Sequence, residues 1–386
     1  MALSTVQSNN QLVKYLDQFI TEWSRENLFS PYQGTEMTSV IRVINALKEG
    51  GEQVNIPLLG KLRGAGVGSG TLTGNEESLD DYGMRAWIDW SRNAIKMKKN
   101  ERHKQSADAF AQARPLLNVW ADEMRRDETI EAFMAVPSET APTNLGSDEG
   151  DRVNGVRFEA ATAGQLNTWN ASNSDRVLYG NSEANYNATF ATALGNVDTT
   201  DDLFTAESSN LLKKIAKRTG RAGPAIKPHK ISNGKEFFVC FHGTNTFRDL
   251  QTSLKEIDRD ARSREGKGMD SNPLFQDGDE LYRGVVHVEV PEIDNYVEDV
   301  WTTLKTAGAS SARVNPVFFC GQQALAFIVG QMPQATTDGT DDYGFYKNAG
   351  IEMAYGVAKM FRKWPKSGSD LKQIGCVQGF FAATGT

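Results

Sequence analysis

The stretch that decides the fold is VNIPLLGKLRGAGVGSGTLTGNEESLDDYGMRAWIDW, residues 54–90. Its first six residues form an apolar run that is typical of a strand, and Pro57 within that run fits the edge of a sheet. A second strand-like run follows at residues 84–90. Six glycines lie between residues 60 and 74, and without a Gly-x-Gly-x-x-Gly motif they indicate backbone freedom rather than phosphate binding. The pattern predicts a long two-stranded hairpin with a mobile, glycine-rich tip.

An amphipathic segment precedes the hairpin. Its apolar residues are spaced by three and four positions and end before Pro31: Leu12, Tyr15, Leu16, Phe19, Ile20 and Trp23. This spacing predicts a helical arm. Because a two-stranded ribbon is at best marginally stable in water, the hairpin also needs a surface to rest on. For both extensions that surface belongs either to the chain's own body or to a neighbouring subunit, and the sequence leaves both open.

The composition describes a soluble chain with more than one folding unit. Of its 386 residues, 39% are hydrophobic and 24% are charged, which excludes the collagen-like, disordered and multi-spanning membrane classes. The N-terminus lacks the pattern of a signal peptide, so we expect no membrane association. A net charge of -7 provides no overall positive field, which disfavours tight binding of DNA or RNA.

Beyond the hairpin, helix and strand patterns mix without a strict alternating repeat, which favours an α+β fold. Strands are predicted at residues 236–241, 284–290, 316–320 and 374–382, and helices at 91–134, 247–264 and 348–363, with a further helix starting at 199–202. Pro115 must kink the first helix or start a second one. The polar stretch 137–194 is predicted to be a loop-rich insertion.

One motif suggests catalysis. The strand end His242-Gly243-Thr244 is similar to the oxyanion strand of lipases and esterases. A serine hydrolase also needs a Gly-x-Ser-x-Gly elbow, and the nearest later serine, Ser310, lacks it. The neighbouring carboxylates at 279–280 and 341–342 have no partner histidine and are typical of solvated loops.

The three cysteines, Cys240, Cys320 and Cys376, are odd in number and have no paired metal-ligand spacing. This indicates buried, reduced thiols rather than disulfides or a zinc site. Cys320 has no base near it in the sequence, so an inert thiol is favoured over a nucleophile. We therefore predict no catalytic, cofactor-binding or metal-binding residues.

The order of these segments resembles the major capsid protein of tailed bacteriophages, in particular a podophage-like capsid family whose fold is shared with encapsulin shells and the herpesvirus capsid floor. The most specific likeness lies in residues 54–59, 62–67 and 72–77. Shorter likenesses lie at 247–250, 272–275, 281–285 and 341–344. The likeness spans most of the chain, and the polar stretch 137–194 departs from it.

The resemblance implies a division of the chain into five regions. These are an N-terminal arm at residues 1–50, an extended β-hairpin loop at 51–92, a peripheral domain with a spine helix and the polar insertion at 93–194, an axial domain at 195–335, and a return to the peripheral domain at 336–386. On the extended loop, the candidate contact residues are Arg63, Gly64, Gly66, Glu76 and Glu77.

The resemblance also implies a structural, non-enzymatic role without cofactors. Copies of the chain would assemble in the host cytoplasm, as hexamers and pentamers, into the icosahedral shell of a virion around DNA that is not bound sequence-specifically. Because the arm begins close to the first residue, a separate scaffolding protein is expected, together with a portal and, outside the shell, room for a decoration protein. Two alternatives stay open: an encapsulin-like cargo compartment, and a serine hydrolase built on His242.

Overall fold

The structure is a computed structural model of the chain. It describes residues 25–60, 62, 64, 66–79, 81–104, 113–218, 225–232, 234–264, 280–336, 343, 345–363 and 368–383. The predicted arm helix at 12–23, the capsid-like match at 272–275, the carboxylates at 341–342 and the contact candidate Arg63 lie outside the described residues.

The chain divides into two compact units. One contains Ser91–Arg125 and Met332–Met353, and the larger one contains Leu28–Trp90, Arg126–Gln331 and Ala354–Thr386. Helices and mixed parallel and antiparallel strands occur together in the larger unit, which confirms the predicted α+β class. The five predicted regions remain a prediction.

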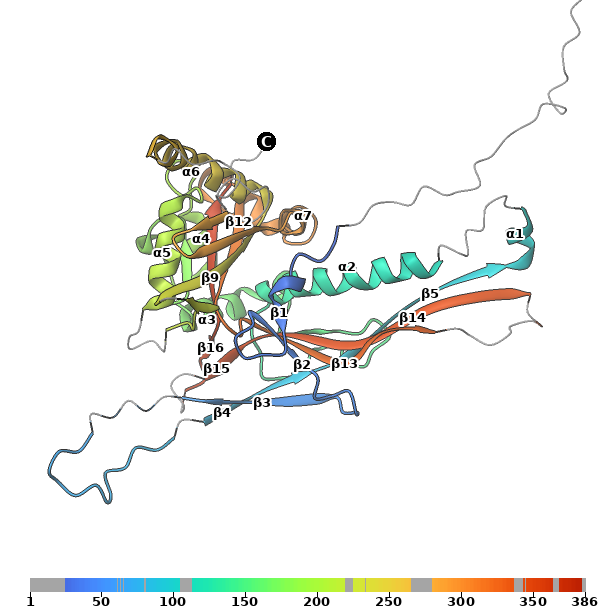
Figure 1. The fold of residues 1–386 in the computed structure, drawn as a ribbon, viewed down its shortest axis with the longest axis horizontal. Coiled ribbons are helices and arrows are strands. Elements are labelled where there is room, and N and C mark those ends of the chain that lie inside the picture. Colours follow the sequence, from blue (N-terminus) through green and yellow to red (C-terminus); the bar gives the residue numbers. More distant parts are fainter. Residues whose placement is uncertain are drawn as a thin grey trace, which may run out of the picture. The chain divides into compact units, whose positions relative to one another are not determined.

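A seven-stranded sheet forms the core of the larger unit (Figure 1). Its order is β10-β11-β9-β12-β17-β7, with β8 paired to β9. The strands are β7 (Val177–Tyr179), β8 (Lys230–Ser232), β9 (Lys235–His242), β10 (Glu280–Tyr282), β11 (Val285–Glu289), β12 (Val314–Cys320) and β17 (Cys376–Ala382). Every residue of β12 and β17 is buried, which is typical of strands covered on both faces. Four of these strands were predicted, at 236–241, 284–290, 316–320 and 374–382.

Each face of this sheet has its own aromatic and aliphatic packing. On one face, Leu212 of α5 (Ala206–Lys217) and Leu250 of α6 (Thr244–Arg264) pack with Phe238 and Phe319. On the other face, Phe133 near the end of α2 (Ala113–Met134) stacks on Phe318, with ring centroids 4.9 Å apart, and also contacts Phe241 and Phe29. Burial of this apolar surface is the main stabilising term of the unit.

A six-stranded sheet has the order β1-β2-β13-β14-β5, with β6 paired to β14. Its strands are β1 (Gln33–Gly34), β2 (Ile41–Ile44), β5 (Asp89–Lys98), β6 (Val153–Asn154), β13 (Leu325–Thr336) and β14 (Tyr346–Lys359). Strand β2 pairs in parallel with both β1 and β13.

Two segments that were predicted to be helices are strands. Residues 91–98 belong to β5, where Ile95 and Met97 alternate with exposed polar residues at the period of two that a strand requires. Residues 348–363 belong to β14 and to β15 (Phe361–Lys363). In β14 the backbone approaches another strand so closely that a Cβ on Gly356 would lie 2.0 Å from the carbonyl oxygen of Trp87. Glycine at this position serves strand packing and also disfavours a helix.

The predicted hairpin is present. Strands β3 (Gln53–Leu59) and β4 (Asp81–Trp87) pair antiparallel from Gln53↔Trp87 to Leu59↔Asp81. One face of the pair is buried through Ile56, Met84 and Ala86, which belong to a cluster with Ala326, Ile328, Ala358, Met360 and Phe361. The strands therefore rest on the chain's own body, and the loop between them continues past their ends (Figure 1). The second strand ends earlier than predicted, because β5 begins at Asp89.

The polar stretch 137–194 is more ordered than the loop-rich insertion that was predicted. It contains α3 (Ala163–Ser172), which begins at a capping box of Thr162 and Gln165, and α4 (Phe190–Gly195). It also supplies β7 to the central sheet, where the Tyr179 ring stacks on Phe380. Phe190 packs against the rings of Phe158, Trp169 and Tyr179, so a buried aromatic cluster orders this segment together with its capping side chains and buried amides.

The remaining elements are short. They are the α-helices α1 (Lys99–Lys104) and α7 (Glu292–Asp299), the 3-10 helices η2 (Ser30–Tyr32), η4 (Phe158–Ala160), η5 (Glu183–Asn185), η8 (Thr302–Thr306) and η9 (Ala309–Ser311), and β16 (Leu371–Gln373). Pro115 lies near the start of the described part of α2, and residues 105–112, which precede this part, lie outside the described residues. Helix α5 is capped by Thr205, later than the predicted start at 199–202. Among the helices of the described residues, none has the length and apolar character to cross a membrane.

Replacing Phe133 by alanine should destabilise the larger unit strongly. The side chain is fully buried among Phe29, Phe241 and Phe318, so its loss removes apolar contacts and leaves a cavity, which costs about 3–5 kcal/mol. The expected result is a clearly lower urea midpoint in the fluorescence unfolding curve. The matched control is Leu116→Ala in the same helix, where the exposed side chain should leave the midpoint within about 0.5 kcal/mol of the parent. Equal midpoints for both variants would contradict this packing.

Candidate functional site

The loop between β3 and β4 is held by its own carboxylates. Oε2 of Glu77 accepts a hydrogen bond from the backbone N–H of Gly64 at 2.7 Å, across the base of the loop. Oε2 of Glu76 accepts one from the N–H of Gly74 at 2.8 Å. Hydrogen bonds to an ionised acceptor are about twice as strong as neutral ones. The structure thus brings four predicted contact residues into one loop and gives both glutamates a defined role.

Three glycines of the loop occupy positions that a residue with a Cβ atom would not fit. A Cβ on Gly64 would lie 2.8 Å from Oε2 of Glu77, too close for an ordinary contact. Gly66 and Gly74 have φ values of +76° and +88°, which side chains with a Cβ rarely adopt. The loop conformation therefore depends on both its glycines and its carboxylates.

The loop and its junction with β3 expose apolar side chains that the sequence reasoning missed. Leu59, Leu62, Leu72 and Leu79 are 72%, 60%, 64% and 61% exposed. Three of these leucines lie in the loop and Leu59 is the last residue of β3, and exposed apolar side chains of this number are candidates for an interaction site. The sequence could have indicated this surface, because leucine recurs in a segment that otherwise consists mainly of glycine and polar residues.

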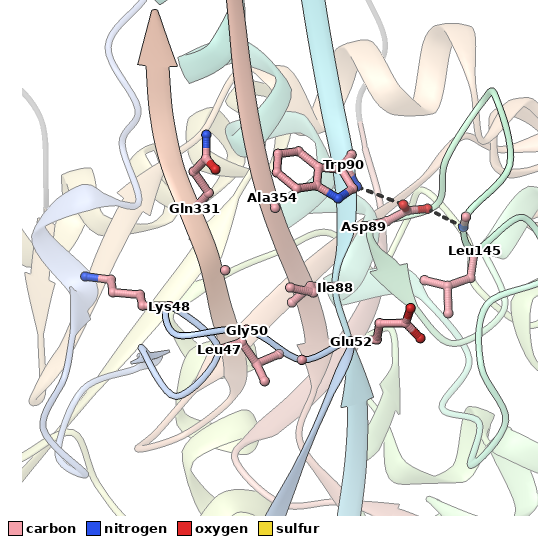
Figure 2. Close-up of a pocket in the computed structure, with 13 residues that line it drawn as sticks. Leu47, Lys48, Gly50, Glu52, Ile88, Asp89, Trp90, Leu145, Gln331 and Ala354 are labelled. Atoms are coloured by element: carbon pink, nitrogen blue, oxygen red, sulfur yellow. Dashed lines mark hydrogen bonds between the residues drawn. The ribbon is translucent and has the colours of Figure 1, made fainter.

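A pocket of about 480 Å³ lies beside the start of the hairpin (Figure 2). Leu47, Ile88, Leu145 and Ala354 contribute apolar surface, and the indole of Trp90 is 52% exposed. The other lining residues are Lys48, Gly50, Gly51, Glu52, Asp89, Gly146, Gly330 and Gln331. This composition suits an apolar side chain better than an anion or a metal ion.

Asp89 organises the wall of this pocket. Its Oδ1 accepts a hydrogen bond from the N–H of Trp90 at 2.8 Å, and its Oδ2 accepts one from the N–H of Gly146 at 3.0 Å (Figure 2). Oδ2 also accepts a hydrogen bond from the N–H of Asp151 at 2.8 Å. The carboxylate is thus occupied with backbone donors and fixes the loop around residue 146 against β5. It acts as a structural ligand of the backbone rather than as a catalytic group.

A second pocket, of about 350 Å³, adjoins the far end of β3. Its lining carries four cationic side chains, those of Arg176, Lys227, Arg362 and Lys372. Asp175 pairs with Lys372 at 2.5 Å. Among the described residues, no group of three or more histidine, cysteine or carboxylate side chains could hold a metal ion.

The strand end at His242 lies in the core. His242 is fully buried, its Nδ1 lies 3.3 Å from Oγ1 of Thr246, and its ring is 5.4 Å from that of His287. Nε2 of His287 lies 3.1 Å from Oγ of Ser209, which is also buried. Ser310 is exposed in η9, and no hydrogen bond joins it to His242 in the described structure. The hydrolase alternative therefore finds no support in this geometry.

The two buried histidines make stability depend on pH. Burial lowers the pKa of His287 to about 3 and holds the pKa of His242 well below its ordinary value, with the neighbouring His287 adding to the effect. In the unfolded chain both titrate near 6.5. Above that value neither state is protonated, whereas below it the unfolded state takes up protons that the folded state excludes. Stability is therefore lost as the pH falls from about 6.5 towards 3.

We expect His287→Gln to make the stability of the protein depend less on pH below about 6.5. Glutamine can keep the hydrogen bond to Ser209 but does not titrate, so the variant should lose about 1.4 kcal/mol less stability per pH unit below pH 6 than the parent. The measurement is the urea midpoint at several pH values between 4 and 8. His103→Gln, at an exposed position, is the control and should follow the parent. Parallel curves for the parent and His287→Gln would contradict the buried-neutral assignment.

Removing the Glu77 carboxylate should loosen the loop. Glu77→Ala abolishes the charge-assisted bond to Gly64, which is worth about 1.5–3 kcal/mol, so the loop should open about tenfold more often. Trypsin cleavage after residues 61 and 63 in the unassembled chain measures this opening. The control Glu49→Ala removes an exposed glutamate outside the loop and should leave the cleavage rate unchanged. Equal rates for both variants would argue against the clamp.

Comparison with known proteins finds similarity to phage capsid proteins. The chain matches the model of the phage capsid protein family over residues 4–375. It is similar to the capsid protein in the asymmetric unit of cyanophage Pam1, with 33% identity over 100% of both chains and a TM-score of 0.86. No curated protein matches the chain.

Two further capsid structures share the fold at lower identity. They are the capsid of Ralstonia phage GP4, with 18% identity over 99% of each chain and a TM-score of 0.68, and that of Helicobacter pylori bacteriophage KHP30, with 12% identity over 97% of this chain and 96% of that one and a TM-score of 0.66. The family match covers almost the whole chain, and the Pam1 likeness covers all of it. The chain belongs to the phage capsid protein family, as a structural, shell-forming major capsid protein.

Proposed function

We propose that the loop of residues 60–79 is the part of the chain through which one copy holds the next in the shell. The observation that carries this proposal is the set of exposed leucines, Leu62, Leu72 and Leu79 in the loop and Leu59 at the end of β3, together with the hydrogen bonds of Glu76 and Glu77 inside the loop. Covering such side chains gains about 1.5–3 kcal/mol each, and the chain's own body leaves them in water. A second copy supplies the missing cover.

The preset shape of the loop favours this role. A free loop would lose conformational entropy on binding, whereas a loop already held by Glu76 and Glu77 loses less. Gly64 and Gly66 then serve the loop's conformation, and the leucines supply the contact area. Arg63, which lies between Leu62 and Gly64 in the sequence, stays a candidate contact residue.

The shell has hexamers and pentamers as its units in this proposal. Closed symmetric assemblies turn modest pairwise contacts into a stable whole, since each copy is held on several sides. We assign the arm to residues 1–50, the extended loop to 51–92, the peripheral domain to 93–194 and 336–386, and the axial domain to 195–335. Strands β7 and β17 of the central sheet lie outside the range 195–335, so we expect the axial region to share its sheet with flanking segments.

The finer setting of the shell is also part of the proposal. The copies assemble in the host cytoplasm around a separate scaffolding protein and a portal, a decoration protein can bind outside, and the packaged DNA is enclosed without sequence-specific contacts. The net charge of -7 supports the last point, because an acidic wall does not adhere to DNA. The chain itself performs no catalysis in this scheme.

Polar substitution of two loop leucines should prevent assembly without unfolding the chain. Leu62→Ser with Leu72→Ser removes apolar area that only a neighbour covers, so the yield of shells should fall at least tenfold. Electron microscopy and size-exclusion chromatography of protein expressed with scaffold measure the yield, and circular dichroism confirms folding. The control is Ile231→Ser, which changes an equally exposed residue on β8. Normal shells from the double variant would refute the assigned role of the loop.

A further inference from the structure

Two cysteines face each other at the end of the central sheet. Cys320 is the last residue of β12 and Cys376 the first of β17, and they are direct partners in the antiparallel register. The next hydrogen bond, from the N–H of Gly321 to the carbonyl of Gly375 at 2.8 Å, lies outside the pair. The two cysteines therefore occupy a non-hydrogen-bonded position, where opposed side chains come closest, with Cα atoms about 4.5 Å apart.

The sulfur atoms are already close. Sγ of Cys320 lies 3.9 Å from Sγ of Cys376, and both residues are fully buried. The Cα spacing of such a pair falls within the range of about 4.4–6.8 Å that a disulfide needs, so side-chain rotation alone can bring the sulfur atoms into bonding distance. Cys240 is excluded as a competitor: it lies opposite Phe319, and alternate residues of a strand point to opposite faces.

A buried lysine approaches the same face of β17, where it contacts Gln378, two residues after Cys376. Lys359 at the end of β14 is fully buried, and its Nζ lies 3.3 Å from Oε1 of Gln378. No salt bridge joins it to another described residue, and the nearest stabilising group for its charge apart from Gln378 is the Trp169 ring, whose centre lies 5.6 Å from Nζ. A buried ammonium group without an anion is costly. Burial lowers its pKa to about 7, and it interacts electrostatically with both thiols. Near neutral pH, part of this amine is therefore unprotonated and can accept a proton. Burial also raises the pKa of the Cys320 thiol well above its ordinary value, so the thiolate is a minor species that forms only as the base removes the proton.

We propose that Cys320 and Cys376 are an oxidisable dithiol that a small peroxide converts into a cross-strand disulfide, with Lys359 as the base. The amine of Lys359 takes the proton of one thiol, and the thiolate attacks a peroxide oxygen. The O–O bond breaks, the sulfur becomes a sulfenic acid, and the leaving hydroxide takes a proton to become water. The second thiol attacks this sulfur, the S–S bond forms, and the hydroxyl leaves as a second water. Two thiols are oxidised and one peroxide is reduced.

The disulfide would join the ends of β12 and β17 and close the chain between residues 320 and 376. A closed loop restricts the unfolded chain, so the oxidised protein is expected to be more stable. Both cysteines are fully buried, and backbone hydrogen bonds continue beyond them, from Gly321 to Gly375 and from Gln322 to Lys227. A small oxidant therefore reaches the thiols only through a local opening of this end of the sheet, so the reaction should be slow. A shell protein made under reducing conditions would gain this bond once its particle meets an oxidising medium.

The test treats the folded full-length protein with hydrogen peroxide and maps disulfides by mass spectrometry. The parent and the control Cys240→Ser should each lose the mass of two hydrogen atoms and yield a 320–376 linked peptide pair, and the melting temperature of each should rise by roughly 5–10 °C. Cys320→Ser and Cys376→Ser should gain oxygen atoms but no intramolecular disulfide. Unchanged thiols in the folded parent, or a disulfide that contains Cys240, would overturn the proposal.

The role of Lys359 is tested by rate rather than by product. Lys359→Met keeps the volume of the side chain but removes the base, so peroxide should form the same disulfide about tenfold more slowly at pH 7. The parent rate should rise up to about pH 7 and then level off as Lys359 becomes fully neutral, whereas the variant rate should keep rising with pH because its thiol ionises only at higher pH. A variant with the parent rate and pH profile would overturn the assignment of Lys359 as the base. Circular dichroism of the reduced variants checks that all are folded.

Discussion

The structure depends on how one face of a two-stranded ribbon is buried. Strands β3 and β4 could not persist alone in water, and they are held because Ile56, Met84 and Ala86 pack onto the chain's own cluster around Met360. These packing contacts do not extend beyond the last residue pair of the ribbon, Leu59 and Asp81. Beyond it the loop carries leucines that its own chain leaves exposed, so the same feature that makes the ribbon stable in one copy leaves a surface for the next.

The core contains polar groups that a purely apolar interior would not need. His242, His287 and Lys359 are fully buried, and burial favours the neutral form of each. The histidines couple folding to acid, whereas the lysine contacts Gln378 on the face of the sheet that carries the thiol pair.

The elements predictable from sequence were those with a strong local pattern. The hairpin followed from two apolar runs around a glycine-rich segment, and β9, β12 and β17 from continuous apolar stretches. The strands at 91–98 and 348–363 were taken for helices, because small and charged residues there satisfy a helical spacing as well as a strand's alternation. Segment 137–194 was misjudged because its order comes from polar capping side chains and from aromatic residues, such as Trp169 and Phe190, that are too widely spaced to give a periodic pattern. The pairing of Cys320 with Cys376 could not be predicted from the sequence, because it depends on the register of two strands that are far apart in the chain. The contact between Lys359 and Gln378 depends on tertiary structure in the same way.

Hydroxyl-radical footprinting of the loop in assembled shells and in unassembled protein tests the central claim most directly. Labelling of Leu59, Leu62, Leu72 and Leu79 should fall several-fold on assembly, while buried core residues such as Phe318 stay unlabelled in both states. If the four leucines are labelled equally before and after shells form, the loop is not the surface that neighbouring copies cover.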